Sequence, residues 1–285
     1  MQKGFLVTHI IRTMVFLIFL CAVSHRTYAA DLTLYIQPYL PATELVKRFN
    51  PLAKYLSDKM GGAVRIKISK SYERHIDFAG EDKADISYFG PGPYIKMVEK
   101  YGEKPLLARL EVRNSPVYYG MIIVRQDSPI QALSDLKGKS FAFGDLHSTM
   151  NYFVPRHMLQ SAGVGLGDLE KHEFLGTHHD IALAVLGGYY DAGGIKEEVF
   201  YSYEKRGLRM LAKSQVVSEH VFVTRSTMNE NLIRQLKKHL LDLNQDKYGL
   251  EILKSIKASV TGIQSVRDED YDAMRLYMMD DEVKR

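Results

Sequence analysis

The sequence is poor in the residues that mark several common classes of protein. Its 285 residues include one cysteine and no tryptophan, which excludes an internal disulfide and a cysteine-rich zinc site. Lysine and arginine total 38 against 34 acidic residues, a net charge of +4, and no basic stripe accompanies this excess. The sequence therefore gives no reason to expect nucleic acid as a partner. An apolar fraction of 46% with 25% charged residues excludes wholesale disorder.

The first 29 residues have the pattern of a secretory signal peptide. Lys3 and Arg12 precede an apolar run at 14–23, and small residues lead up to Ala29. We predict cleavage after Ala29 and a mature protein in the periplasm. Because the apolar run is about half of the roughly 20 residues that a helix needs to cross a bilayer, retention as a short membrane anchor is the weaker alternative.

Cleavage would change the composition of the protein. The lone Cys21 would leave with the signal peptide, and because it follows Leu20 rather than a small residue, a lipoprotein is not expected. Three basic residues and no acidic residue would leave as well, so the mature chain would carry 35 basic against 34 acidic residues. The mature protein would therefore be thiol-free and close to neutral.

The rest of the sequence alternates short apolar segments with helical patterns. This alternation predicts βαβ units and a largely parallel sheet. Strands are expected at 32–36, 64–68, 85–89, 105–110, 117–124, 140–143, 172–175, 190–193, 208–212 and 221–224. Helices are expected at 45–60, 72–79, 94–100, from Ser148 onward, and at 179–186, 197–205, 229–243, 248–257 and 268–279.

Two predicted strand-to-helix loops have compositions that suit ligand binding, which in open α/β sheets occurs beyond the carboxyl ends of strands. Loop 88–94 combines Tyr88 and Tyr94 with two glycines and two prolines, and its alternative is a tight turn with core aromatics. Loop 144–151 ends in a helix start at Ser148 and Thr149, where hydroxyl and backbone N–H donors could bind an anion. Its alternative is simple helix capping.

A third loop begins another predicted helix at Thr177, where Asp180 is placed to complete a capping box. One of His178 and His179 could donate to an anionic ligand. A zinc site formed by these two histidines and His220 is disfavoured, because no element supplies a second spaced pair of ligands. No nucleophile motif is present, so the sequence does not support catalysis by a serine or a cysteine.

In their order and spacing, these motifs resemble the phosphate, phosphite and phosphonate-binding periplasmic proteins of ABC transporters (the PhnD-like family). The resemblance extends over about residues 31–275. It rests on Pro-Leu-Ala-Lys-Tyr-Leu at 51–56, Ala-Asp-Ile-Ser-Tyr-Phe-Gly-Pro at 84–91, Asp-Leu-Lys-Gly-Lys at 135–139, Phe-Gly-Asp at 143–145, Ser-Thr at 148–149, and the segment from His179 to Gly193.

The resemblance implies an α/β type II periplasmic-binding-protein fold. Two lobes with mixed, mostly parallel sheets would be joined by two hinge strands and would close on a ligand. Lobe 1 would comprise 31–120 plus 222–285, and lobe 2 would comprise 121–221. The protein would deliver its ligand to an ABC permease or, alternatively, present it to a membrane sensor. An enzyme on this scaffold is the third possibility, and the export signal argues against it.

The resemblance also implies the positions of ligand contacts. Anion contacts would come from Ser148, Thr149 and the following backbone N–H groups, with His179 and Tyr94 nearby. Where relatives often have Ser-Gly, this chain has Met150 and Asn151. Further ligand contacts are predicted at Tyr39, Tyr88, Glu198 and Glu219. We expect a monomer that binds a small anion, with no cofactor, metal or catalytic residue.

Overall fold

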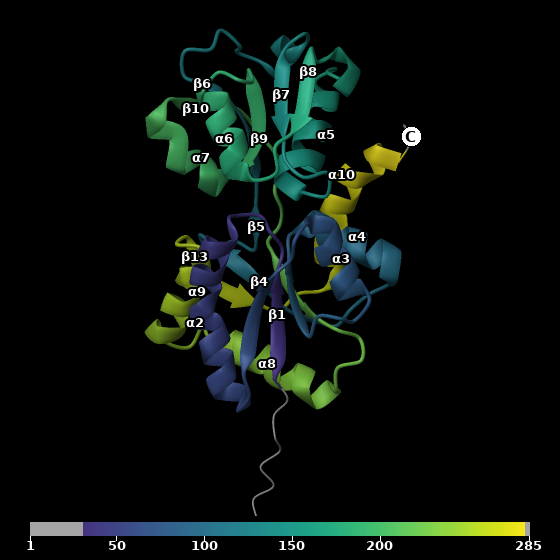
Figure 1. The fold of residues 1–285 in the computed structure, drawn as a ribbon, viewed down its shortest axis with the longest axis vertical. Coiled ribbons are helices and arrows are strands. Elements are labelled where there is room, and N and C mark those ends of the chain that lie inside the picture. Colours follow the sequence, from purple (N-terminus) through teal and green to yellow (C-terminus); the bar gives the residue numbers. More distant parts are fainter. Residues whose placement is uncertain (1–30, 283–285) are drawn as a thin grey trace, which may run out of the picture. The chain divides into compact units, whose positions relative to one another are not determined.

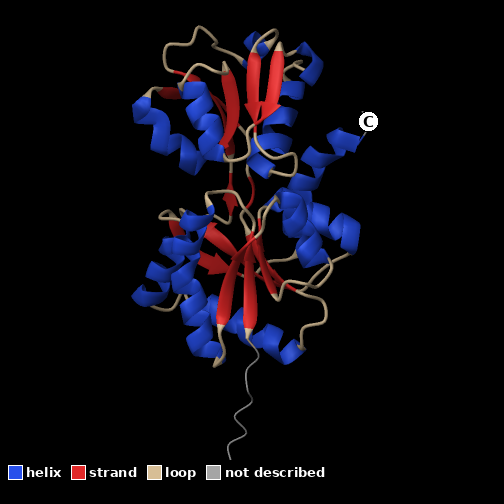
Figure 2. Cartoon of the chain, in the orientation of Figure 1, coloured by secondary structure: helices blue, strands red, loops and turns tan. Residues whose placement is uncertain are grey.

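Two β-sheets, each flanked by helices, make up the described part of the chain (Figures 1 and 2). The computed structural model describes residues 31–282, so the predicted signal peptide and Cys21 lie outside the described residues. Among residues 31–282, no helix combines the length and the apolar character needed to cross a membrane.

The first sheet has six strands in the order β13-β4-β12-β3-β1-β2. They are β1 (Leu32–Ile36), β2 (Val64–Ile68), β3 (Ile86–Phe89), β4 (Leu106–Val112), β12 (Val221–Thr224) and β13 (Val260–Gln264). The accompanying helices are α2 (Ala42–Met60), α3 (Tyr72–Gly80), α4 (Pro91–Tyr101), α8 (Glu230–Asp242) and α9 (Lys247–Ile256). Side chains alternate between the two faces: Phe222 packs with α2, α8 and α9, whereas Val221 and Val223 pack in the cluster that contains α3 and α4 residues.

The second sheet has five strands in the order β10-β6-β9-β7-β8. They are β6 (Gly120–Arg125), β7 (Ser140–Phe143), β8 (Lys171–Phe174), β9 (Ala192–Lys196) and β10 (Leu208–Lys213). Helices α6 (His178–Leu186) and α7 (Glu197–Tyr203) pack in one cluster with this sheet, and α5 (Val154–Ser161) packs in another. The last helix, α10 (Asp272–Glu282), contacts both α4 and α5.

The chain passes between the two sheets through a short two-stranded ribbon. β5 (Val117–Tyr118) and β11 (Val217–Ser218) pair antiparallel, one on the way out and the other on the way back. The predicted strand 117–124 is therefore two strands, since β5 belongs to the ribbon and β6 to the second sheet. The ribbon supplies the two joining strands that the fold class implied, while the division into lobes at 120/121 and 221/222 stays a prediction.

The sheets are mixed, as the fold class implied, but their parallel part is smaller than expected. The two large sheets contain four parallel and five antiparallel strand pairs. The prediction of a mostly parallel arrangement is wrong for a topological reason. β6 enters the second sheet directly from the ribbon, beside the end of its neighbour β9, and therefore runs opposite to it. In the same way, β12 enters the first sheet beside the end of β3 and runs opposite to that strand.

Most other predicted elements are confirmed, with two informative exceptions. The strands at Val64–Ile68, Ser140–Phe143 and Val221–Thr224 have the predicted bounds. Strand β13 was not predicted, because it is short, contains a glycine and finds its partner β4 about 150 residues away. The predicted loop 88–94 is mostly regular structure: β3 ends at Phe89 and α4 begins at Pro91, since proline is well suited to the first helical position.

Candidate ligand-binding site

The candidate site lies where several strands end or begin. The chain leaves β1, β3, β7 and β9 near this edge and enters β12 from it, which matches the general location of ligands in α/β sheets. A small polar cavity there has a free volume of about 10 Å³, which is room for one water-sized group in this conformation. Its lining residues are Gln37, Tyr39, Tyr72, Tyr118, Ser148, Thr149, Met150, His178, Lys196 and His220.

One side of the cavity is formed by the turn before α5. Residues Thr149–Phe153 form a π-helical turn, in which the Ser148 carbonyl accepts hydrogen bonds from the N–H groups of Tyr152 and Phe153, both at 3.2 Å. Pro155 follows at the start of α5 and has no N–H to donate, so it cannot continue the regular α-helical hydrogen bonds at this point. Backbone N–H groups of a first turn lack acceptors within the helix, which makes them available to a ligand.

The two hydroxyls of this turn both bond with tyrosine side chains. Ser148 precedes the turn, but its side chain makes no capping hydrogen bond in this described segment, and it bonds with Tyr72 instead. Thr149 Oγ1 accepts a hydrogen bond from the N–H of Gly92 at 2.8 Å and also bonds with the side chain of Tyr118. The alternative of simple capping by Ser148 is therefore wrong. Both residues are buried.

A group of buried aromatic rings forms the wall next to this turn. Tyr39 lines the cavity, and Tyr88 stacks on His220 with ring centroids 5.2 Å apart and an interplanar angle of 15°. Burial raises the pKa values of Tyr39, Tyr72 and Tyr118, with nearby carboxylates adding to the effect for Tyr39 and Tyr118. These phenols therefore stay protonated and can donate hydrogen bonds at any physiological pH.

Another part of the cavity lining consists of His178 and Lys196. The backbone N–H of Lys196 donates to His178 Nδ1 at 3.1 Å, so the ring hydrogen of this histidine lies on Nε2. The Lys196 ammonium lies 3.1 Å from Glu198 Oε2 and 4.3 Å from the centroid of the Tyr39 ring. Burial lowers the pKa of Lys196, and Glu198 opposes that shift.

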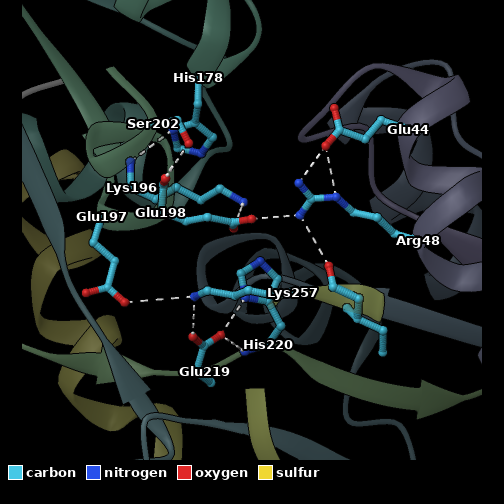
Figure 3. A network of polar contacts seen from close by, with 11 residues as sticks. Glu44, Arg48, His178, Lys196, Glu197, Glu198, Ser202, Glu219, His220 and Lys257 are labelled. Carbon is cyan, nitrogen blue, oxygen red and sulfur yellow. Dashed lines mark hydrogen bonds and ion pairs between the residues drawn. The ribbon is translucent and has the colours of Figure 1, made fainter. Parts of the chain in front are cut away.

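Behind this side lies a network of buried charges (Figure 3). Arg48 on α2 binds Glu198 on α7 at 2.7 Å. Glu219 accepts from Lys257 at 3.1 Å and from His220 Nδ1 at 2.9 Å. Burial raises the pKa of Glu219, but Lys257 and His220 outweigh it and hold the pKa at about 2, so this carboxylate is ionised.

The structure brings together part of the predicted set of site residues. Tyr39, Ser148, Thr149 and Met150 line the cavity, while Asn151 and Tyr88 are buried next to lining residues. Glu198 and Glu219 are engaged in the ion pairs behind the wall. His179 and Tyr94 bond elsewhere, His179 Nδ1 with the Tyr203 hydroxyl at 3.1 Å and the Tyr94 hydroxyl to Asp268 at 2.6 Å.

Some lining residues were missed by the sequence analysis. His178, rather than His179, faces the cavity, and helix periodicity could have shown this, because 178, 181, 182 and 185 share the buried face of α6. Lys196 was also missed: it is the last residue of the fully buried strand β9, and a lysine in such a strand is a signal of a functional site. Within residues 31–282, no group of three histidine or acidic side chains is placed to hold a metal ion.

Comparison with known proteins gives a consistent result. The family model "ABC transporter, phosphonate, periplasmic substrate-binding protein" matches residues 34–271. The phosphate-import protein PhnD of Mycolicibacterium smegmatis is 27% identical over 274 residues, covering 87% of this chain and 85% of the relative. The phosphonates-binding periplasmic protein of Escherichia coli is 24% identical over 197 residues, covering 65% of this chain and 58% of the relative.

Solved structures share the fold. PhnD1 of Prochlorococcus marinus, in complex with methylphosphonate, superposes with a TM-score of 0.79 at 20% identity, covering 88% of this chain and 97% of that chain. A binding protein component of a phosphonate ABC transporter from Pseudomonas aeruginosa has the same TM-score and identity, covering 88% and 86%. With the match over residues 34–271, the chain belongs to the family of periplasmic substrate-binding proteins of phosphonate ABC transporters.

Proposed function

We propose that this protein captures a small phosphonate- or phosphate-like oxyanion in the cavity and delivers it to an ABC permease. The observation that supports this most is the composition of the cavity wall, where hydroxyls, a histidine N–H and an ammonium group converge on a compact space. Tetrahedral oxyanions accept several hydrogen bonds at once, and charged acceptors strengthen each bond.

Local donors must supply the attraction, because the net charge cannot. After loss of the predicted signal peptide, the chain carries 35 basic and 34 acidic residues. Lys196 is salt-bridged to Glu198, so it supplies a donor with little net charge. Capture of the anion then depends on the arrangement of donors in a partly desolvated site, where each hydrogen bond is stronger than in water.

Capture would proceed by closure of the predicted lobes. Gln37, Tyr39 and Tyr72 belong to predicted lobe 1, whereas Ser148, Thr149 and Lys196 belong to predicted lobe 2. A ligand that bonds to both sets is bound more tightly by the closed state than by the open state, and therefore shifts the population toward closure. The ribbon of β5 and β11 would act as the hinge.

The remaining parts of the proposal concern export and assembly. The protein would be exported to the periplasm with cleavage after Ala29 and would act as a monomer. It would have no catalytic role of its own, because its part in transport is to bind and release.

Thermal unfolding of the purified mature protein tests the proposal. Phosphate, phosphite, methylphosphonate, sulfate and methanesulfonate would each be added at increasing concentration. We expect at least one of the phosphorus oxyanions to raise the Tm, since a ligand at 100 times its Kd stabilises the folded state by about 2.7 kcal/mol. If no anion changes the Tm at any concentration, the proposed function is wrong.

A further inference from the structure

His220 presents an unprotonated nitrogen to the cavity. Its Nδ1 lies 2.9 Å from Glu219 Oε2, and an ionised carboxylate can only accept, so the ring hydrogen must be on Nδ1. The same carboxylate is held by Lys257 through its other oxygen at 3.1 Å, which fixes its orientation. In neutral His220, Nε2 is then a lone-pair acceptor with no hydrogen to donate.

The surroundings of Gly90 show where this nitrogen lies. A methyl group added at the Gly90 Cα would be 2.9 Å from Gln37 Nε2, 3.5 Å from His220 Nε2 and 3.6 Å from Thr149 Oγ1. These three atoms therefore converge on one point at the cavity wall, and His220 Nε2 is placed beside the donors that would hold an oxyanion.

The other polar groups named at the wall are able to donate. His178 carries its hydrogen on Nε2, and Gln37 uses its oxygen to accept from the Gly90 N–H at 2.8 Å, which leaves its amide N–H groups for the cavity. Thr149 likewise accepts from Gly92, and its hydroxyl hydrogen can be donated to Tyr118 or to a ligand. An oxyanion without hydrogen satisfies such donors, but one of its oxygens would then face the lone pair of His220, which is repulsive.

We propose that His220, oriented by Glu219, selects oxyanions that carry an acidic hydrogen, so that the ligand is a hydrogen phosphonate, hydrogen phosphite or phosphate and not a sulfate or sulfonate. This inference rests on the proposed function and narrows it to a ligand class. The bound ligand donates its P–OH hydrogen to His220 Nε2, and its remaining oxygens accept from the hydroxyl, amide and ammonium donors. Glu219 is a positioning residue, because it acts through the ring of His220.

The charges around His220 favour its neutral form before the ligand binds. Burial lowers the pKa of His220, the hydrogen bond and charge of Glu219 raise it, and Lys196 and Lys257 lower it, with a net lowering. The other titratable groups that face the ring or its charge are His178, Glu198 and the phenols of Tyr39, Tyr88 and Tyr118. In the complex, the acidic hydrogen of the ligand then lies in a hydrogen bond between a ligand oxygen and His220 Nε2.

Methylphosphonate and methanesulfonate provide the test, since their singly charged forms have the same shape and differ by one hydrogen. By isothermal titration calorimetry at pH 6.5, we expect the wild-type protein to prefer methylphosphonate by about 100-fold or more, because a site built to bond a ligand OH rejects an analogue without it. Above the second ionisation of methylphosphonate, the complex holds one more proton than the separated partners, so affinity should fall about tenfold per pH unit. In this higher pH range, titrations in two buffers of different ionisation enthalpy should show that about one proton is taken up when methylphosphonate binds.

The variant Glu219→Gln tests the positioning role. Glu219 accepts from Lys257, from His220 Nδ1 and from the His220 backbone N–H, and a single amide oxygen cannot accept from all three, so the amide no longer holds the ring hydrogen on Nδ1. The preference for methylphosphonate should then fall at least tenfold or reverse, and the dependence on pH should flatten. Glu197→Gln is the matched control, because Glu197 is a buried carboxylate 3.9 Å from the same Lys257 and is not bonded to His220; the preference should be unchanged.

The outcomes separate this inference from the proposed function. If no anion binds to the wild-type protein, the proposed function fails. If methylphosphonate binds but methanesulfonate binds equally well, or no proton is taken up at high pH, the function stands and the role of His220 is overturned. An unchanged preference in a folded Glu219→Gln variant would also overturn it. Should that variant not fold, the proton count of the wild-type protein decides.

Discussion

The two sides of the cavity are built on different physical principles. The turn at 148–151 offers hydroxyl and backbone donors that come from consecutive residues of one segment. The other part of the lining, the charged side, offers His178, Lys196 and His220, which come from three separate segments and are held by Glu198, Glu219 and Lys257. The turn carries no charge, whereas the charged side combines two neutral histidines with ionised groups that largely neutralise one another.

This difference indicates a division of labour. Neutral donors can bind an anion without a large cost of burial, and their removal affects the bound state most. Buried ion pairs have a high desolvation cost and depend on every partner, so a change there affects folding first. We infer that the hydroxyl side contributes mainly affinity, and that the charged side contributes specificity at the expense of stability.

Loss of one partner on the charged side should have the largest effect. In Lys257→Met, Glu219 would remain buried without its cation, and we expect the free energy of unfolding at pH 7 to fall by about 3–5 kcal/mol. Lys254→Met, in helix α9 just before Lys257, is the control, because Lys254 pairs with Glu251 at the surface, and it should change stability by less than about 0.5 kcal/mol. Urea unfolding of the two variants and the wild-type protein measures these losses. Equal losses of stability in the two variants would contradict the inference that the buried charges are the ones that matter for folding.

The pH dependence of the same variant sharpens this prediction. The pKa of Glu219 is lowered to about 2, so its stabilising contribution is present above its unfolded pKa and is lost as pH falls toward 2. Without Lys257, burial should raise that pKa, and the variant should approach wild-type stability as the pH is lowered and the carboxyl becomes protonated. A stability difference that does not change with pH would mean that the charge of Glu219 is not the cause.

Removal of the hydroxyls should have the next largest effect, and on affinity. Ser148→Ala and Thr149→Ala should each weaken binding of the preferred oxyanion by about 1–3 kcal/mol, because each hydroxyl would donate to a charged acceptor. Ser226→Ala, at an exposed site, is the control and should bind normally. Calorimetric titration measures the difference. Unchanged affinity in the double variant would show that these hydroxyls do not contact the ligand.

Of the three kinds of substitution, a methyl group added at Gly90, where Gln37, His220 and Thr149 converge, should have the smallest effect. In Gly90→Ala, the backbone is tolerant because φ is −76°, but the added carbon would be only 2.9 Å from Gln37 Nε2, and it would also contact His220 and Thr149. Overpacking of this kind costs about 1–3 kcal/mol, and side chains facing a cavity can move, so we expect affinity to fall about tenfold. Gly167→Ala, with nothing within 4 Å of the added carbon, should bind normally; equal affinities would contradict the convergence at Gly90.

Sequence patterns were sufficient for the parts of the site that are local. Ser148 and Thr149 could be recognised because a strand, a loop and a helix start follow one another in the sequence. The capping box of Thr177 and Asp180 was predicted and is present, with Thr177 N donating to Asp180 at 3.1 Å. Each of these features depends on residues a few positions apart, so short-range geometry determines them.

The charged side could be predicted only in part, because its contacts join distant segments. Glu219 was expected to meet the ligand directly, and in the structure it lies behind His220 and pairs with Lys257, 38 residues further along the chain. Glu198 pairs with the neighbouring Lys196 and also with Arg48, which is 150 residues away. No local pattern distinguishes such a paired carboxylate from one that faces a ligand.

The sequence by itself determined the alternation of strands and helices, the apparent export signal, the near-neutral mature charge and the family resemblance. Tertiary structure decided which of two adjacent histidines faces the cavity, that β6 and β12 run antiparallel to β9 and β3, and that His220 presents Nε2 rather than an N–H. The physical reason is the range of the interactions. Periodicity and capping act within a few residues, whereas strand direction, burial of charge and the position of a ring hydrogen depend on partners that only the folded chain brings together.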